Sequence, residues 1–535
     1  MAEKYTEEQL NKLDKDMLVK MYLSLQEQMV LLNKNMELVL EQLSVLNRNK
    51  YGRGSEKMEA STQLEFKEVD GEVVITFNEA EALADDKADE LTEEVIRKKN
   101  PRKKGKKASD LENLPKKIIQ HEISDEELKK MYPDEEWKRL PDEIYHRYKY
   151  TPAKIYVEEH HVAVYSGKKT ETMNKAKHPA SLLRGSLVSP SIEAGIIVGK
   201  YANAMPLARI EKMFEQYSLP ITRQNMANWT IRCAEEYLSL LYDELKSDLM
   251  KNHVIQADET PLLVNKDGRP AGSKSYMWVY RTGKYNKDKP IILYDYQMTR
   301  RTDHPREFLK SYNGICVTDG YQVYHSLEKE MEDLTIAGCW AHARRRYDEA
   351  VKALPEGERK LSIAYAALSQ IQAIYNEESK LQGMESVDRR KERIKNIKPL
   401  VEAHFVWVKK NIDKVLPKSK THNGMTYSLN QEKYLKRFLD DGEVPMDNNA
   451  AEQSIRPFCI GKKNWVMCDT INGAKASAII YSLVETAKAN KLKLFEYFDY
   501  VLTEIPEHME DTNRDFLKKL LPWSPDLPKE CRKQK

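Results

Sequence analysis

The sequence predicts a multidomain α+β protein with an N-terminal coiled-coil helix, a helix-turn-helix region and a mixed α/β domain that carries a helical insertion. Three observations predict this fold class. The chain has 535 residues, more than one hydrophobic core usually organises. A seven-residue apolar repeat lies near its N-terminus. Five short β-rich runs follow residue 253, with helix-like segments mainly after them.

The composition excludes several classes of protein. Lys and Arg number 87 against 84 Asp and Glu, a formal net charge of +3, so any affinity for polyanions depends on where the charges lie. The six cysteines form no CxxC pair, which argues against a disulfide framework and a sulfur-rich zinc site. The charged N-terminus has no apolar run behind it, and no uncharged stretch approaches about 18 residues. We expect a cytoplasmic protein without a membrane partner.

The first predicted domain, residues 1–50, is a coiled-coil dimerisation helix. Its apolar side chains fill both core positions of four heptads, and neither Pro nor Gly interrupts them between residues 18 and 46. The alternative is an amphipathic helix that packs on its own domain, and self-association would distinguish the two. The two ladders are Leu18, Leu25, Leu32, Val39, Leu46 and Tyr22, Met29, Met36, Leu43.

Residues 51–110 are predicted to be an acidic and then a basic linker. Eight of the eleven residues in RKKNPRKKGKK (97–107) are Lys or Arg, and Pro101 and Gly105 prevent a regular helix. An extended basic tract suits contact with a phosphate backbone, although a solvated linker has the same composition. The DNA-binding candidates here are Lys98, Lys99, Arg102, Lys103 and Lys104.

A small β-containing module is predicted at 111–185, because residues 141–165 alternate apolar and charged side chains as a two-stranded unit would. A helix-turn-helix region follows at 186–250, with helices at 205–217 and 223–233 and Thr222 as the N-cap of the second. In such a motif the first turn of the second helix faces base edges, although the same geometry occurs in ordinary helix packing. The residues so presented are Arg223, Gln224 and Asn225, which suit guanine and adenine.

Three acidic residues are candidates for one site. Asp258 and Asp319 each close a β-rich run, and Glu452 lies on the first turns of a helix that Asp447 or Asn448 can cap. Neighbouring carboxylates need a counter-charge, which hard divalent cations with oxygen ligands supply. Two magnesium ions held in this way support in-line phosphoryl transfer. Taken singly, each aspartate is also explained as a turn or cap residue.

At these residues the sequence resembles the transposases of the insertion sequence 66 family, which carry a DDE triad on an RNase H-like fold. The motifs that carry the resemblance are ADET (257–260), VTDGY (317–321), GCWAHARRRY (338–347), DNNAAEQSIRPFCIGKKNWVMC (447–468) and YSLVETAKAN (481–490). The resemblance implies that Asp258, Asp319 and Glu452 are both the catalytic and the metal-binding residues. It implies two Mg²⁺ ions, with Mn²⁺ as a substitute.

The resemblance also organises the rest of the chain. It implies a catalytic core in two parts, 251–353 and 441–510, which a helical insertion (354–440) separates, and a C-terminal tail (511–535). The charged helices of the insertion are predicted to break at Pro399 and Pro417. Family members commonly carry a cysteine-bearing zinc-finger-like module before the helix-turn-helix. Residues 108–190 contain no cysteine, so we predict no structural zinc.

Further residues have a functional and a structural interpretation. His342 and Arg345 are candidates for contact with DNA near the second aspartate, whereas Trp340 is more typical of a core. Lys462 and Lys463 follow the glutamate helix and could contact a phosphate at the element's end, or form a solvated turn. Asp447 is better explained as a helix cap. Glu259 alternates to the other side of its strand from Asp258 and is not a predicted ligand.

The predicted function is that of a DDE transposase of a bacterial insertion sequence, which binds the element's ends and catalyses DNA strand cleavage and strand transfer. The implied partners are double-stranded DNA of the ends and the target, and a second copy of the chain in a homodimer or larger homo-oligomer. Small accessory proteins of the same element are a further candidate. The alternatives are a non-catalytic or domesticated DNA-binding protein, and an RNase H-like nuclease without strand transfer. We expect association with the nucleoid.

Overall fold

The computed structural model describes residues 118, 123–131, 133, 154–166, 173–177, 181–270 and 272–533. The predicted coiled coil (1–50) and the acidic and basic linkers (51–110), with all five of their candidate DNA-binding residues, lie outside the described residues. The chain divides into a large unit that includes Pro179–Glu211 and Thr222–Cys531, and a small unit that holds residues 212–221 and the described residues before 178. In the described part of the chain, no helix is long and apolar enough to cross a membrane.

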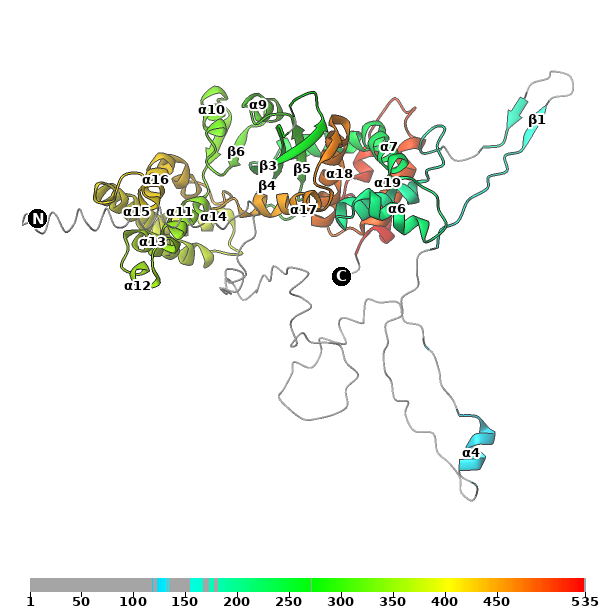
Figure 1. Ribbon diagram of the computed structural model, residues 1–535, viewed down its shortest axis with the longest axis horizontal. Coiled ribbons are helices and arrows are strands. Elements are labelled where there is room, and N and C mark those ends of the chain that lie inside the picture. The colour runs from blue at the N-terminus through cyan, green and yellow to red at the C-terminus, as the bar shows by residue number, and fades with distance from the viewer. Residues whose placement is uncertain are drawn as a thin grey trace, which may run out of the picture. The chain divides into compact units, whose positions relative to one another are not determined.

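A mixed sheet forms the centre of the large unit (Figure 1), as the β-rich runs predict. The strand order is β5-β4-β3-β6-β7, and β8 pairs with the far end of β3. β4 is antiparallel to both β3 and β5, whereas β6 runs parallel to β3 and β7 parallel to β6. The strands are β3 (Val254–Lys266), β4 (Lys274–Thr282), β5 (Ile292–Gln297), β6 (Gly314–Val317), β7 (Leu334–Ala337) and β8 (Cys468–Thr470).

Helix α18 (Ile471–Ala489) covers the edge strand β5. The Tyr294 amide donates to Ser482 Oγ at 2.7 Å, and the Thr486 hydroxyl bonds both the amide and the carbonyl of Ile292 at 3.0 and 2.9 Å. These side chains take the place of a neighbouring strand, so the edge presents fewer unpaired backbone groups. The YSLVETAKAN motif therefore has a structural explanation.

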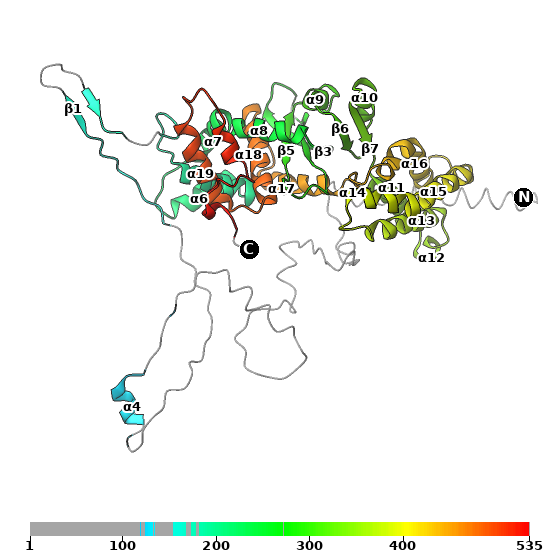
Figure 2. The same cartoon turned by 180° about the vertical axis from the view of Figure 1, so that it is seen from behind.

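The segment before the sheet is helical (Figure 2). The two helices predicted for the helix-turn-helix are present as α6 and α7, and residues 216–222 lie between them in the chain. Thr222 caps α7 as predicted, since its hydroxyl accepts from the Asn225 amide at 3.2 Å, and Glu211 Oε1 accepts from the Arg223 amide at 2.9 Å. The elements are α5 (Pro190–Ile197), η2 (Val198–Ala202), α6 (Leu207–Glu215), α7 (Arg223–Cys233), η3 (Ala234–Leu238) and α8 (Ser239–Met250).

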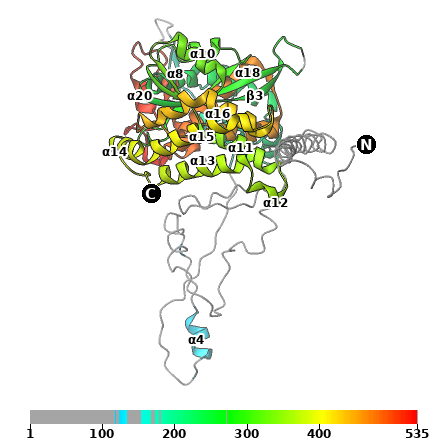
Figure 3. The same ribbon diagram turned by 90° about the vertical axis from the view of Figure 1, so that its left-hand side faces the viewer.

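One short helix lies between β5 and β6 and another between β6 and β7, and a set of longer helices follows β7. The connecting helices are α9 (Asp303–Phe308) and α10 (Gln322–Glu330). In Figure 3, α11, α13, α15 and α16 lie side by side as one layered bundle. The bundle elements are α11 (Trp340–Lys352), α12 (Glu356–Arg359), α13 (Ile363–Ser379), α14 (Ser386–Glu392), η4 (Arg393–Ile397), α15 (Lys398–Asn411), η5 (Ile412–Lys414), α16 (Lys420–Lys436) and η6 (Arg437–Leu439).

The bundle has a hydrophobic core of its own, distinct from the core under the sheet. Trp340 is fully buried in it, as its core interpretation requires, and its indole N–H donates to the Leu435 carbonyl at 2.8 Å. The Trp340 ring lies 5.8 Å from the rings of both His404 and Phe405. Because Val317 and Ala337 belong to the same core, the bundle is packed against the ends of β6 and β7.

One expectation about the insertion is wrong. Pro399 does not break its helix, because helical structure runs without interruption through α14, η4 and α15, with Pro399 near the start of α15. The wider π-type turn of η4 directly before the proline accommodates the missing N–H donor and the ring. Pro417 does lie in a break, between η5 and α16.

The chain returns to the sheet through the long helix α17 (Asn449–Trp465) and ends in α19 (Leu494–Glu507), α20 (Phe516–Leu520) and η7 (Lys529–Cys531). Residues 511–535 are described above as a C-terminal tail. Within the described part of that segment, Leu517, Leu520, Leu521 and Leu527 are buried in the core under the sheet. This segment is therefore part of the packed unit up to Cys531.

Before residue 178, the described residues of the small unit form one helix and one pair of strands. Ser124 and Glu127 form a capping box at the start of α4 (Asp125–Met131). Antiparallel strands β1 (Val164–Ser166) and β2 (Met173–Lys175) pair from Val164↔Lys175 to Ser166↔Met173. The two-stranded unit expected within 141–165 differs from this: residues 154–163 contain no strand. None of their apolar side chains is buried, and Tyr156 and Val157 are exposed, so the alternating pattern has no buried face to stabilise a strand.

The fold predicts a pH-dependent stability. Glu193 of α5 is fully buried, its Oε1 accepts from the Thr230 hydroxyl at 2.8 Å, and burial raises its pKa from 4.5 to about 8. Between these values the folded state keeps a proton that the unfolded state releases, so the free energy of unfolding falls as the pH rises, by at most about 1.4 kcal/mol per pH unit. Glu193→Gln removes this titration. As the pH rises, the Tm of the Glu193→Gln protein should fall less than the Tm of the unaltered protein.

Thermal melts across this pH window measure the effect. Glu235→Gln, at an exposed position of η3, is the matched control and should follow the unaltered protein. Equal pH dependence of all three proteins would contradict the assignment of a protonated Glu193.

Candidate active site

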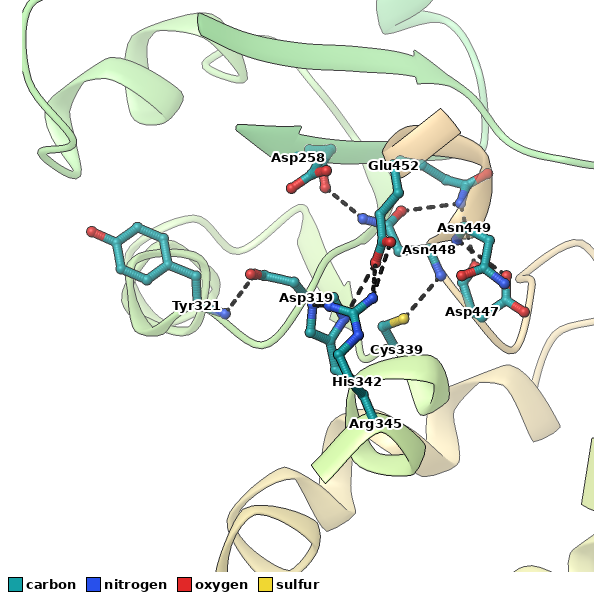
Figure 4. Close-up of polar contacts among 12 residues, drawn as sticks. Asp258, Asp319, Tyr321, Cys339, His342, Arg345, Asp447, Asn448, Asn449 and Glu452 are labelled. Carbon is teal, nitrogen blue, oxygen red and sulfur yellow. Dashed lines mark hydrogen bonds and ion pairs between the residues drawn. The ribbon is translucent and has the colours of Figure 1, made fainter. Parts of the chain in front are cut away.

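Three elements of the large unit bring Asp258, Asp319 and Glu452 together (Figure 4). Asp258 belongs to β3, Asp319 follows β6 by two residues, and Glu452 lies in the first turn of α17. The expectation that Asp258 ends its strand is wrong, because β3 continues to Lys266. However, the parallel pairing of β3 with β6 stops at Gln256↔Val317. Asp258 and Asp319 therefore both lie just beyond the point where these two strands separate.

Burial and the neighbouring negative charges together determine the electrostatics of this group. Burial raises the pKa of Asp258 well above its ordinary value, and the negative charges of Glu259, Asp319 and Glu452 raise it further. A single hydrogen bond from the Glu259 amide to Asp258 Oδ1, at 2.9 Å, acts in the opposite direction. The site therefore favours a positive ion or a proton between these carboxylates.

Asn448, the residue before α17, joins the glutamate helix to β3. Its side-chain N–H donates to the Ala257 carbonyl at 2.8 Å, and its Oδ1 accepts from the Gln256 side chain at 3.0 Å. Its backbone N–H donates to Cys339 Sγ at 3.1 Å. Asn448 is 0% exposed. The Asn448 side chain therefore does not cap α17, which was one of two expectations. The other candidate, the Asp447 carboxylate, accepts from the Asn449 amide at 3.2 Å.

The helical bundle holds the second aspartate. The Tyr427 hydroxyl on α16 donates to the Asp319 carbonyl at 2.8 Å, and the Asp319 carboxylate accepts from the Tyr321 amide at 2.9 Å. Gly320 between them has a φ of +87°, and a Cβ there would lie 2.8 Å from the Tyr427 hydroxyl. Glycine is required by both the backbone conformation and the approach of Tyr427.

Two cationic or titratable side chains of α11 surround Glu452. An Arg345 guanidinium nitrogen lies 3.2 Å from the carboxylate, and His342 Nδ1 lies 3.7 Å from Oε1, too long for a hydrogen bond. Cys339, His342 and Glu452 offer ligand atoms within 4.8 Å of one another. Burial raises the pKa of the Cys339 thiol to about 12, and its sulfur accepts from Asn448, so it acts here as a positioning group.

Glu259 points to a different partner from Asp258. Its buried carboxylate pairs with the Arg300 guanidinium, whose plane also lies over the Tyr321 ring at 3.7 Å. Burial and the charge of Asp319 raise the pKa of Glu259 to about 7, against the effect of Arg300. This pairing agrees with the exclusion of Glu259 from the predicted ligands.

The remaining predicted residues that the structure describes belong to other parts of the large unit. Arg223, Gln224 and Asn225 are exposed on the first turn of α7. At the other end of α17, the Lys462 ammonium donates to the Pro261 carbonyl at 2.9 Å, and Lys463 is exposed.

The positioning roles of Asn448, Tyr427, Gln256 and Cys339 are not predicted from the sequence. Asn448 was noted only as a helix cap, and its place in the DNNAAE motif was the available signal. Tyr427 lies 108 residues from Asp319, with no motif around it.

The chain thus combines a mixed α/β sheet, three convergent carboxylates and a preceding pair of helices, α6 and α7. These features are typical of proteins that process nucleic acids with the help of metal ions. Family comparisons agree with this class. The model described as "Transposase IS66 family" matches residues 185–476, more than half of the chain, and "IS66 C-terminal element" matches 482–523. A third model, "Transposase C of IS166 homeodomain", matches 39–119. The chain belongs to the IS66 family of transposases.

Relatives of this chain occur in Sinorhizobium fredii. The uncharacterized protein y4qI is 26% identical over 496 residues, which cover 90% of this chain and 88% of the relative. A second uncharacterized protein, y4jD, is 27% identical over 361 residues, or 65% of this chain and 68% of the relative. The similarity to y4qI therefore extends over nearly the whole length of both proteins.

Tyr427 provides a test of how the bundle positions the site. Tyr427→Phe removes the hydroxyl that holds the Asp319 carbonyl, and a displacement of about 1 Å in a catalytic group can reduce the rate about a hundredfold. We expect a large fall in kcat for DNA cleavage with little change in DNA affinity.

Cleavage and binding assays on the same DNA measure the two effects. Tyr434→Phe is the matched control on α16, because that ring stacks on His325 rather than meeting Asp319. Equal activity of Tyr427→Phe and Tyr434→Phe would contradict a positioning role.

Proposed function

We propose that the protein is a DDE transposase that cuts DNA at the ends of its element and joins the freed 3′ ends to target DNA. The observation that carries this proposal is the convergence of Asp258, Asp319 and Glu452. Burial raises the pKa of Asp258, and the charges of Glu259, Asp319 and Glu452 raise it further. Membership in the IS66 family supports a DNA-processing enzyme.

The strand order supports an RNase H-like fold for the catalytic domain. Three antiparallel strands are followed by two parallel ones, and the first strand of the series, β3, is at the centre. The first carboxylate lies on this central strand and the second follows its parallel neighbour. The long helix α17 adds the third.

The carboxylate group fits divalent metal ions. All three predicted ligands offer oxygen donors, which Mg²⁺ and Mn²⁺ prefer, and in the described part of the chain no cationic side chain pairs with Asp258. When bound by Asp258, Asp319 and Glu452, two such ions would polarise the attacking and leaving oxygens of a phosphoryl transfer. Asn448 and Tyr427 keep the carboxylates in place before DNA arrives. Arg345, half-exposed beside Glu452, is suited to meet a phosphate.

Other segments supply the proposed DNA contacts. The exposed first turn of α7 would present Arg223, Gln224 and Asn225 to base edges. The basic tract at 97–107 lies within the segment that matches the homeodomain-type model. His342, Arg345, Lys462 and Lys463 remain proposed contacts closer to the cleavage point.

The proposed assembly contains at least two copies of the chain, because two element ends require two active sites. The coiled coil at 1–50 is the proposed dimerisation element. A nuclease of the same fold without strand transfer and a non-catalytic DNA-binding protein are the alternatives, and an assay that follows both cleavage and joining distinguishes all three.

Substitution of the triad tests the catalytic proposal. Asp258→Asn, Asp319→Asn and Glu452→Gln each remove a ligand charge at nearly constant shape, so each should abolish cleavage and leave binding to end DNA nearly intact. Activity should require Mg²⁺ or Mn²⁺ and fail with Ca²⁺, which binds oxygen more loosely and at longer distance.

Asp469→Asn is the matched control, since Asp469 is an exposed carboxylate that pairs with Lys266 at 2.7 Å outside the site. Cleavage retained within about tenfold by any triad variant would remove that residue from the catalytic set. Equal rates with Ca²⁺ would contradict the two-metal mechanism.

The two proposed kinds of DNA contact should respond differently to substitution. Arg223→Ala or Gln224→Ala should reduce discrimination between end DNA and random DNA by about 1 to 3 kcal/mol for each lost base contact. Neutralising Lys98, Lys99, Arg102, Lys103 and Lys104 should weaken binding to all sequences and flatten its salt dependence. Binding isotherms at several salt concentrations measure both. The same sequence-independent loss in both sets would contradict base reading by α7.

A further inference from the structure

Two exposed apolar residues, Val466 and Met467, follow α17 on a strained backbone, and we call them the tip. Val466 follows the helix with φ +66° and ψ −54°, and the Met467 amide donates to the Trp465 carbonyl at 2.8 Å, which closes a three-residue γ-turn. A β-branched residue rarely adopts a positive φ, because its Cβ crowds the backbone. Strained residues of this kind cluster at functional sites.

The side chains of the tip project into solvent although both are apolar. Val466 is 58% exposed and Met467 is 46% exposed. Trp465 directly before them packs edge-on against Phe458, with ring centroids 5.6 Å apart, so the tip is attached to the core. Val466 and Met467 are therefore exposed apolar side chains on a firmly anchored helix end, and we call this arrangement the wedge.

Basic residues lie near this tip in the chain. Lys463 and Lys475 are exposed, and Lys462 lies one turn before Val466. Burial raises the pKa of Cys468, next to Met467, and the nearby Lys200 ammonium opposes that effect. The acidic neighbour, Asp469, is already paired with Lys266. Basic residues beside two apolar side chains complement duplex DNA, whose phosphates flank apolar base faces.

The tip also lies between two sites of the proposed function. Glu452 and Trp465 are separated by about 20 Å of helix. On the other side, the Asn464 side chain donates to the Ala204 carbonyl at 3.0 Å, in the loop that leads into α6, and Ile231 of α7 approaches Gly473. DNA that extends from the carboxylates towards the helix-turn-helix would therefore pass the tip.

We propose that Val466 and Met467 insert between stacked bases of the DNA about six base pairs from the cleavage point, a spacing set by the length of α17. This inference rests on the proposed function, because it takes DNA as the ligand. Two exposed side chains are too small a patch for a stable protein interface, and the lysines near them in the chain favour a polyanion.

The test uses the full chain and duplexes from the DNA that flanks its coding region, with a fluorescent adenine analogue at successive positions from the end. Binding should raise the fluorescence at one base step through unstacking. Val466→Ser and Met467→Ser should remove that rise and weaken binding about tenfold. Ile460→Ser, at a 56% exposed apolar position of the same helix, is the matched control and should retain both.

The outcomes separate this inference from the proposed function. Normal DNA binding and cleavage without a fluorescence rise, or with the same rise in the Met467→Ser protein, would overturn the wedge alone. A smaller sedimenting species for Met467→Ser with unchanged fluorescence would assign the tip to contact between copies of the chain and would also overturn it. No binding or cleavage of any duplex by the unaltered protein would overturn both.

Discussion

The buried amide of Asn448 joins the glutamate helix to the central strand, and the arrangement of the carboxylates depends on this joint. Asp258 directly follows Ala257, whose carbonyl accepts from Asn448, and Glu452 lies one turn after Asn448. The distance between the first and third carboxylates is thus set by hydrogen bonds within the protein. Because these polar atoms are buried, losing one partner would leave others unsatisfied, which costs more than the hydrogen bond itself.

The helical bundle contacts the carboxylate site and helps to position it. It has its own core around Trp340, and that core includes Val317 and Ala337 from the parallel strands. From this bundle Tyr427 reaches the Asp319 carbonyl, and α11 places Arg345 against Glu452. A family motif can therefore serve packing or positioning as well as chemistry, as the edge contacts of Ser482 and Thr486 also illustrate.

Local signals predicted much of the fold. The β-rich runs correspond to β3 to β7, and Thr222 caps α7 where its position before the helix indicated. The signals were insufficient where neighbours decide the structure. β3 extends well past Asp258 because β4 pairs with it as far as Leu263, and β8, some two hundred residues later, pairs with its end. Helix packing around η4 likewise overrides the local effect of Pro399.

The sequence by itself determined the types of element, the α7 cap and the three acidic residues, because periodicity, capping and motif spacing are local properties. Only the tertiary structure decided that these acids meet, that Asn448 and Tyr427 position them, and that Val466 and Met467 remain exposed at the end of α17. The reason is physical. Hydrogen bonds between residues a hundred or more positions apart, and the exposure of a side chain, depend on how the elements pack and leave no periodic signal in the chain.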